Sequence, residues 1–171
     1  MSTAVASNTV DPADLKGVHR TFVTGVTVVT TQHEGTPRGL AVNAFSSISL
    51  DPPLVMVCVQ KTSSTYESLF ASRHLAINIL AADQLGVAGT FAGKSQDKFS
   101  EIRWHPGTHG SPVVDGACAH VEAEICERLQ TDTHTVFIAR VLEAEHSDRA
   151  PLVYSAGSFY DGGRLAPAET A

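Results

Sequence analysis

Cysteine is scarce in this sequence. Only Cys58, Cys118 and Cys126 occur among its 171 residues, and no two of them form a C-x-x-C pair. An odd number of isolated cysteines fits neither a disulfide framework nor a zinc site, and is typical of a reducing compartment. We therefore expect a cytoplasmic protein.

Metal-binding patterns are equally sparse. Eight histidines are present, but they form no H-E-x-x-H or H-x-H pair. His105 and His109 lie in a glycine-rich segment, where we expect no carboxylate beside them. A metal site usually combines such ligands at fixed spacing, so none is predicted.

Three motifs of nucleotide and hydrolase chemistry are missing. The sequence contains no G-x-G-x-x-G, no G-x-x-x-x-G-K-[ST] and no G-x-S-x-G. Their absence argues against a Rossmann enzyme, a nucleotide hydrolase with a P-loop and a serine hydrolase with a nucleophile elbow. A dinucleotide would have to bind in another way.

Long hydrophobic runs and basic clusters do not occur either. No run approaches the roughly 18 apolar residues of a membrane span, and the first ten residues have neither a Lys or Arg nor the apolar core of a signal peptide. Twelve Lys and Arg against 18 Asp and Glu give a net charge of -6. We therefore expect no nucleic-acid or membrane partner, and an anionic ligand would need a local site.

The remaining composition is that of one globular domain. Hydrophobic residues make up 43% of the chain and charged residues 18%, which is too apolar for a disordered protein. At 171 residues the chain is long enough for a single core. We predict a domain over residues 11–163, between flexible tails at 1–10 and 164–171.

Local patterns predict a mainly β protein. Asp11 and Pro12 begin a short amphipathic helix with Leu15, Val18, His19 and Phe22 along one face. A strand bent at Gly25 follows, then a turn over residues 34–39 and two strands joined at Asp51-Pro52-Pro53. The second of these, at 54–59, is continuously apolar and is predicted to be buried on both faces.

The second half continues the pattern. Ser64 and Glu67 form a capping box for a helix to about Arg73, and Asp83 is positioned to cap another over residues 84–93. Residues 95–110 are predicted to be loop. Further strands are expected at 74–80, 119–129, 134–146 and 152–160, with Glu122, Glu124 and Arg128 near the exposed face of the second. Six or seven strands with short helices are typical of an antiparallel barrel.

Two polar segments at strand and helix ends are candidate binding sites. Residues 43–47 offer an amide, hydroxyls and backbone N–H groups to a phosphate or a flat polar ring, but are equally consistent with an ordinary turn. Residues 61–65 open the capped helix, where N–H groups and the Lys61 ammonium suit an anion. Capping by Ser64 alone is the alternative.

Longer motifs resemble one family. They are TGVTVVT at 24–30, GLAVNAFSSISLDPPLV at 39–55, Phe91-Ala92-Gly93, Lys98-Phe99, His134 before an apolar strand, Pro151-Leu152 leading to Tyr154, and Gly157-x-x-Tyr160. Over residues 12–161 the chain resembles the short-chain flavin reductases, the reductase components of two-component flavin-dependent monooxygenases. The resemblance implies the FMN-binding split-barrel fold, a mainly β barrel with a few short capping helices.

The resemblance also implies a function. An NAD(P)H-dependent flavin reductase (EC 1.5.1) of this kind is a homodimer that reduces FAD or FMN with a hydride from NADH, less often NADPH, and supplies the reduced flavin to a partner monooxygenase. His134 is carried over as the catalytic residue and, with Tyr160, as a nicotinamide contact. The flavin contacts carried over are Asn43, Ala44, Ser47, Cys58, Val59, Gln60, Ser64, Thr65, Phe91 and Lys98.

Two positions depart from the family pattern. Ala41 stands where a threonine is common, and Asp132-Thr133-His134 replaces the usual Gly-Asp-His. Two other functions stay open: a module that holds flavin as a tight prosthetic group, and a split-barrel oxidase of a small amine or pyridoxal-type phosphate. The oxidase calls for a basic phosphate cluster, and the basic residues are expected to be too dispersed for one: Arg38, Lys61, Lys94 and Lys98.

Overall fold

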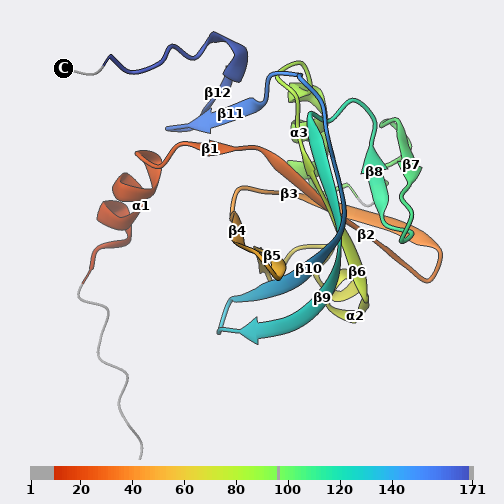
Figure 1. Cartoon of the computed structure of the whole chain (residues 1–171). Coiled ribbons are helices and arrows are strands. Elements are labelled where there is room, and N and C mark those ends of the chain that lie inside the picture. The colour runs from red at the N-terminus through yellow and green to blue at the C-terminus, as the bar shows by residue number, and fades with distance from the viewer. Residues whose placement is uncertain (1–9, 96, 170–171) are drawn as a thin grey trace, which may run out of the picture.

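The computed structural model describes residues 10–95 and 97–169. Helices α1 (Pro12–Arg20), α2 (Tyr66–Ala71) and α3 (Leu85–Ala92) are short and accompany an extensive set of strands (Figure 1). The strands of the first half are β1 (Thr24–Gly25), β2 (Thr27–His33), β3 (Thr36–Val42), β4 (Phe45–Leu50), β5 (Pro53–Gln60) and β6 (His74–Ile79). Those of the second half are β7 (Trp104–Pro106), β8 (Pro112–Val114), β9 (Ala119–Gln130), β10 (His134–His146), β11 (Leu152–Ser155) and β12 (Ser158–Asp161).

One seven-stranded antiparallel sheet forms the body of the protein. Its order is β3-β2-β6-β9-β10-β5-β4, so the two edge strands, β3 and β4, are consecutive in the chain. The Cys58 amide on β5 donates to the Ala44 carbonyl in the link between them, at 3.0 Å. Register shifts in the β9–β10 pair, one between Ile138 and Ala139, add local twist. The sheet thus curls back on itself, and the prediction of a mainly β antiparallel barrel is confirmed.

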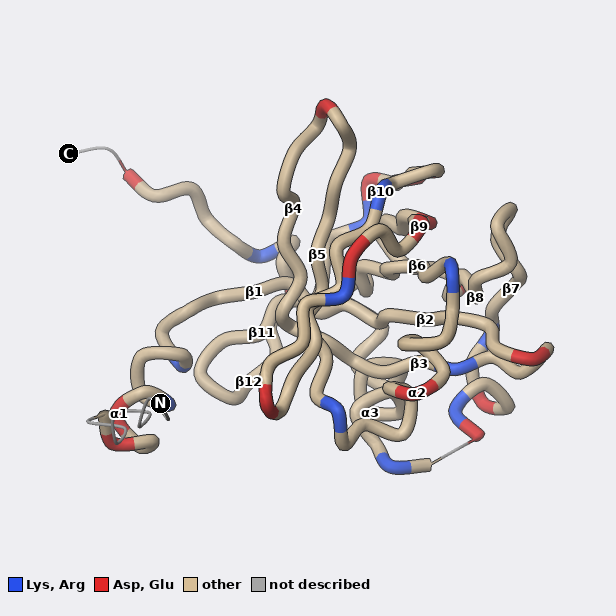
Figure 2. The backbone as a smooth tube through the Cα atoms, turned by 90° about the horizontal axis from the view of Figure 1, so that it is seen from below, with Lys and Arg blue, Asp and Glu red and all other residues tan. Residues whose placement is uncertain are grey.

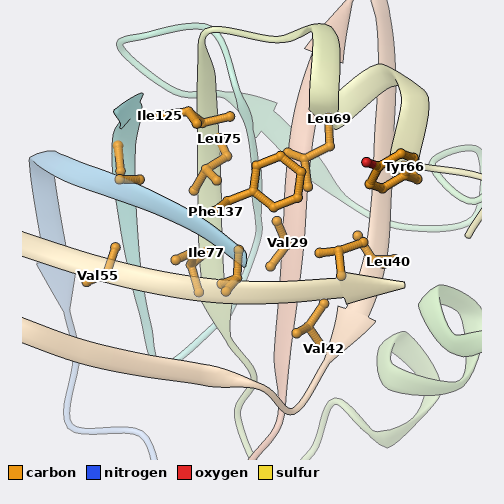
Figure 3. Close-up of a cluster of buried hydrophobic side chains, with 14 residues drawn as sticks. Val29, Leu40, Val42, Val55, Tyr66, Leu69, Leu75, Ile77, Ile125 and Phe137 are labelled. Carbon is orange, nitrogen blue, oxygen red and sulfur yellow. The ribbon is translucent and has the colours of Figure 1, made fainter. Parts of the chain in front are cut away.

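The barrel interior is filled by aliphatic and aromatic side chains (Figure 3). Val29, Leu69, Leu75 and Phe137 are each 0% exposed within it. Fully burying a side chain of this size contributes about 1.5–3 kcal/mol. A second cluster, which includes Phe91 and Phe99, packs α3 against β2 and β8. The two clusters hold fixed the strand ends on which the candidate site is built.

A small sheet and the N-terminal helix extend from the barrel. Strands β1, β11 and β12 pair as a separate three-stranded sheet, and α1 stands apart from the barrel in two perpendicular views (Figures 1 and 2). The predicted helix start is confirmed, because the Asp11 side chain accepts from the Ala13 amide at 2.8 Å. The predicted apolar face stays uncovered, since α1 contains no buried residue.

Several predicted boundaries were wrong. Within residues 34–39, β3 already begins at Thr36, and only Glu34 and Gly35, with φ of 50° and 75°, form the hairpin turn. Strand β5 is not buried on both faces: Val55, Val57 and Val59 are buried, whereas the residues between them are half-buried. The face of β5 that carries Leu54, Met56 and Cys58 is therefore free to line a cavity.

The predicted caps of the second and third helices, α2 and α3, were wrong. Helix α2 begins at Tyr66 after Thr65 and ends at Ala71, with no side-chain cap from Ser64 or Thr65. Helix α3 begins after Gln84, also without a side-chain cap. Asp83 instead receives two hydrogen bonds from Arg149, at 2.6 and 2.8 Å, and these lower the pKa of its carboxyl. At Asp83 a tertiary partner thus replaced the predicted cap, and the Thr65 hydroxyl donates to the Gly39 carbonyl instead of capping α2.

The segment predicted as loop contains structure, and it explains a buried carboxylate. Strand β7 lies in this segment and pairs as a hairpin with β8, which follows it. Glu122, predicted near an exposed face, is 1% exposed, and its carboxylate accepts from the amides of His109 and Ser111 at 2.9 and 3.1 Å. The expectation of no carboxylate beside the loop histidines was also wrong, because His105 Nδ1 lies 2.7 Å from Asp115 Oδ1.

Gly107 leaves the space that the Glu122 carboxylate occupies. A Cβ at residue 107 would lie 2.4 Å from Glu122 Cδ. We expect Gly107→Ala to lower the free energy of unfolding by about 1–3 kcal/mol, because the anchored carboxylate cannot move without losing its donors. Urea denaturation measures this. Gly89→Ala in α3, where a Cβ meets nothing within 4 Å, is the matched control, and equal stability of both variants would contradict the prediction.

Candidate functional site

An open cleft of about 970 Å³ lies between the barrel, α3 and the β11–β12 hairpin. Its walls are the ends of β3 and β5, the segment that leads into α2, the C-terminal half of α3 and the first residue of β10. Its volume is at the upper end of the range for small-molecule and cofactor sites. The alternate face of β5, which is only half-buried, opens into it through Cys58.

The cleft gathers most of the sequence-predicted site residues. Those that line it are Asn43, Ala44, Cys58, Val59, Gln60, Ser64, Phe91, Lys98 and His134. They come from separate parts of the chain. The fold therefore brings into one cleft residues that the sequence motifs had predicted to bind flavin or nicotinamide. Phe91 is 1% exposed and serves the core and the cleft wall at once.

Three predicted site residues are not among the residues that line the cleft. Ser47 lies exposed on the edge strand β4, next to the bulge between Ser47 and Ser49. Tyr160 follows Phe159 on β12 and therefore points to the other side of the hairpin. Thr65 is 2% exposed, and its hydroxyl donates to the Gly39 carbonyl at 2.8 Å. Its single proton is used within the protein.

Sequence reasoning missed two aromatic residues of the cleft. Tyr154 on β11 and Phe159 on β12 both line it, and they pair directly across the hairpin. The turn at the centre of LVYSAGSFY could have located them, since it places residues 154 and 159 opposite each other. The family motif included Tyr154, but of these aromatic residues only Tyr160 was assigned a role.

Lys98 is a buried cation at one end of the cleft. It is 5% exposed, and its Nζ donates to the carbonyls of Phe91 and Gly39 at 2.9 and 3.3 Å. Burial lowers the pKa of this ammonium. No carboxylate pairs with it among the described residues. Because an ammonium has three protons and two carbonyls take two of them, one remains for a ligand oxygen.

Basic residues gather around Lys98, contrary to the expectation that they were dispersed. Lys94 lines the same cleft. Arg38 lines a small recess that shares Lys98 and Ser64 with the cleft. Lys61 lies apart, where its Nζ donates to the Thr131 carbonyl at 2.6 Å. None of the described residues that line the cleft is an aspartate or a glutamate. In a chain of net charge -6, this end of the cleft is locally cationic.

His134 is the first residue of β10 and lies beside the last residue of β5. It is paired in register with Gln60, and its Nδ1 lies 2.8 Å from the Thr133 hydroxyl. This contact leaves Nε2 for a ligand in the cleft. Thr133 thus orients the ring in the altered Asp132-Thr133-His134 motif.

Cys58 is another titratable residue of the cleft wall. Burial raises the pKa of its thiol, so the uncharged form prevails near neutral pH and the residue acts as an apolar part of the wall.

Among residues 10–95 and 97–169, no three His, Cys, Asp or Glu side chains are grouped as a metal ion requires. In the same part of the chain, no helix is long and apolar enough to cross a membrane.

Comparison with known proteins gives a consistent result. Residues 19–163 match the model of the flavin reductase like domain. The chain is 37% identical over 149 residues to the reductase component of 4-nitrophenol 4-monooxygenase/4-nitrocatechol 2-monooxygenase of Rhodococcus opacus, covering 87% of this chain and 80% of that protein. It is 38% identical over 138 residues to an FMN reductase (NADH) of Agrobacterium fabrum, covering 81% and 79%.

Solved structures share the fold. The NADH:FAD oxidoreductase of Streptomyces globisporus superposes with a TM-score of 0.84 at 36% identity, covering 95% of this chain and 99% of that one. The same protein was also solved in complex with NAD and FAD fragments. Two other curated relatives are longer, and the chain spans 49% and 48% of their length.

Proposed function

The chain belongs to the flavin reductase like family, and from that premise we propose that it reduces FAD or FMN with a hydride from NADH and releases the reduced flavin to a partner monooxygenase. It is a flavin reductase and therefore an oxidoreductase; the subclass EC 1.5.1 follows if the donor is NADH or NADPH. Relatives named as an NADH:FAD oxidoreductase and an FMN reductase (NADH) support both flavins and favour NADH.

One observation carries the proposal: the cleft has a cationic end and largely apolar or neutral walls. FAD and FMN combine phosphate groups with a planar ring system, and both features have counterparts in the cleft. Lys98 has one ammonium proton left and no carboxylate partner in the described chain, so a phosphate oxygen would complete its coordination. The residues present therefore fit a flavin.

The chain's own residues bind and orient the reactants. When bound, the flavin accepts the hydride that the nicotinamide donates, so no strongly basic protein group is required. Lys98 and the Ser64 hydroxyl would hold phosphate, with Thr65 fixing the Gly39 carbonyl that Lys98 also uses. The walls formed by Asn43 and Cys58 would flank the ring and limit the access of water.

His134 is proposed to contact the nicotinamide through Nε2. We expect His134→Ala to raise KM for NADH about three- to tenfold, the range for one lost hydrogen bond, while the flavin Kd changes little. Steady-state kinetics with saturating FMN measure the first and fluorescence titration the second. His146→Ala, at the exposed far end of β10, is the control. Unchanged KM and kcat in His134→Ala would remove this assignment.

We also propose that the protein is a homodimer. Val18 of helix α1 and Phe22, which follows the helix, are 64% and 74% exposed, and an isolated helix of nine residues is marginal in water. A second copy would cover this face. Light scattering should give twice the chain mass of 18.1 kDa, and a monomer would refute the assignment.

The three free thiols support our proposal of a cytoplasmic location.

The test of the function is flavin-dependent oxidation of NADH by purified protein. The rival in which flavin is a tight prosthetic group predicts a yellow protein whose colour survives dialysis. The proposal predicts colourless protein after dialysis that binds added flavin reversibly, because the cleft is open and Asn43 and Ala44 on its wall are exposed.

A further inference from the structure

Two aromatic side chains from the β11–β12 hairpin line the cleft. The Tyr154 and Phe159 rings have centroids 5.2 Å apart and an interplanar angle of 59°, and both line the cleft. Tyr154 is half-buried against the cluster that contains Val26 and Phe91. Phe159 is 43% exposed. Cofactor sites are lined largely by apolar and aromatic side chains, and Phe159 presents its ring to such a cleft.

The hairpin holds this pair in place. Ala156 and Gly157 have φ of 51° and 93°, as a tight turn requires, and the Arg20 guanidinium donates to the Ala156 carbonyl at 2.8 Å. On the other side, Tyr154 pairs with Thr24 of β1. The rings are therefore presented by a braced hairpin.

The register of the strands places the pair beyond the Val42 end of β3, whereas Lys98 contacts Gly39 earlier in the same strand. Lys98 bonds the carbonyl of Gly39 in β3, and β3 runs from there to Val42, which pairs with Thr27. Strand β1 precedes Thr27 in the chain, and its Thr24 pairs with Tyr154. Tyr154 therefore lies beyond the Val42 end of β3. Gly39 and Asn43 are four residues apart, roughly 13 Å at the rise of an extended strand. The cationic and aromatic ends of the cleft thus lie at opposite ends of this stretch.

This separation matches the shape of a flavin, in which a flexible ribityl chain joins a phosphate to a flat ring. We propose that Phe159, backed by Tyr154, is the stacking subsite for the flavin ring, while Lys98 holds the phosphate. The inference rests on the proposed function, in that the cleft is taken to bind flavin. It assigns the ring contact to Phe159, in place of a role for the neighbouring Tyr160.

Riboflavin and FMN test this division of the ligand, because only FMN has the phosphate. Fluorescence titration of Phe159→Leu should show about a tenfold loss of affinity for riboflavin and an equal loss for FMN, the range for one lost aromatic stacking contact. Phe159→Tyr should restore both affinities to within about twofold. Tyr160→Leu is the matched control, since it removes an equally exposed aromatic residue that does not line the cleft. It should leave both affinities unchanged.

Each contrary result has a definite meaning. Unchanged riboflavin affinity in a folded Phe159→Leu variant overturns the inference. A raised KM for NADH with intact riboflavin affinity also overturns it, because the nicotinamide would then stack on Phe159. A loss of affinity confined to FAD overturns it as well, because the adenine of FAD would then occupy that position. A wild-type protein that binds flavin but does not oxidise NADH refutes the proposed function and leaves the stacking test standing. Wild-type protein that binds no flavin refutes both.

Discussion

Replacing Lys98 with methionine is expected to lower the affinity for FMN by about 10- to 100-fold. The ammonium is buried, is fixed by two backbone carbonyls and has one proton left. A hydrogen bond to a charged group contributes about 1.5–3 kcal/mol, which corresponds to this range. Methionine keeps the apolar stem while removing the charge, so the loss reports on the phosphate contact.

Two controls make this result specific. The affinity of Lys98→Met for riboflavin should stay within about threefold of the wild-type value, because riboflavin has no phosphate. Lys94→Met removes the exposed lysine of the same cleft and should cost less than about threefold, since exposed ion pairs contribute little. FMN affinity should also fall as pH rises through the Lys98 pKa, which burial lowers. Equal FMN binding by wild type and Lys98→Met would show that the phosphate binds elsewhere.

Substituting Gly39 with alanine is expected to impair folding and binding together. A Cβ there would lie 2.7 Å from Phe91 Cε1 and 3.2 Å from Thr30 Cγ2. Phe91 is fully packed, so the strain should lower the free energy of unfolding by about 1–3 kcal/mol. The Gly39 carbonyl accepts from both Thr65 and Lys98. Displacing it should therefore weaken FMN binding as well.

A double-mutant cycle isolates the steric cause. Phe91→Leu in the Gly39→Ala background should recover part of the lost stability, since the two sites are in direct contact. Gly86→Ala in α3 is the control for the extra methyl group, because a Cβ there meets nothing within 4 Å. Denaturation in urea gives the stabilities, and additive effects of the two substitutions would contradict the account.

Much of the fold was predictable because local chemistry agreed with the final structure. The Asp11 cap, the interruption of the strand after Gly25 and the break at Asp51-Pro52-Pro53 each depend on residues close in sequence. The predictions that were wrong involve partners far along the chain. Asp83 pairs with Arg149 instead of capping α3, and Glu122 is buried because amides of the loop before β8 reach it.

In the candidate site, too, local motifs predicted some features, whereas others depend on contacts between distant parts of the chain. Motifs identified residues from five segments, and the barrel brought Asn43, Cys58, Ser64, Lys98 and His134 to one cleft. The burial of Lys98 depends on the packing of α3 against β3, which local sequence does not contain. The choice between Phe159 and Tyr160 depends on which side of a two-stranded hairpin faces the cleft, and a shift of one residue reverses it.

The most direct test of the account is the rate of NADH oxidation by the dialysed protein with FAD, with FMN and with neither, followed by the loss of reduced-nicotinamide absorbance. The account predicts rapid turnover only when a flavin is added, and the faster flavin names the preferred acceptor. Absence of turnover with both flavins, with NADPH as well as NADH, despite measurable flavin binding, would contradict it and favour a flavin-binding module.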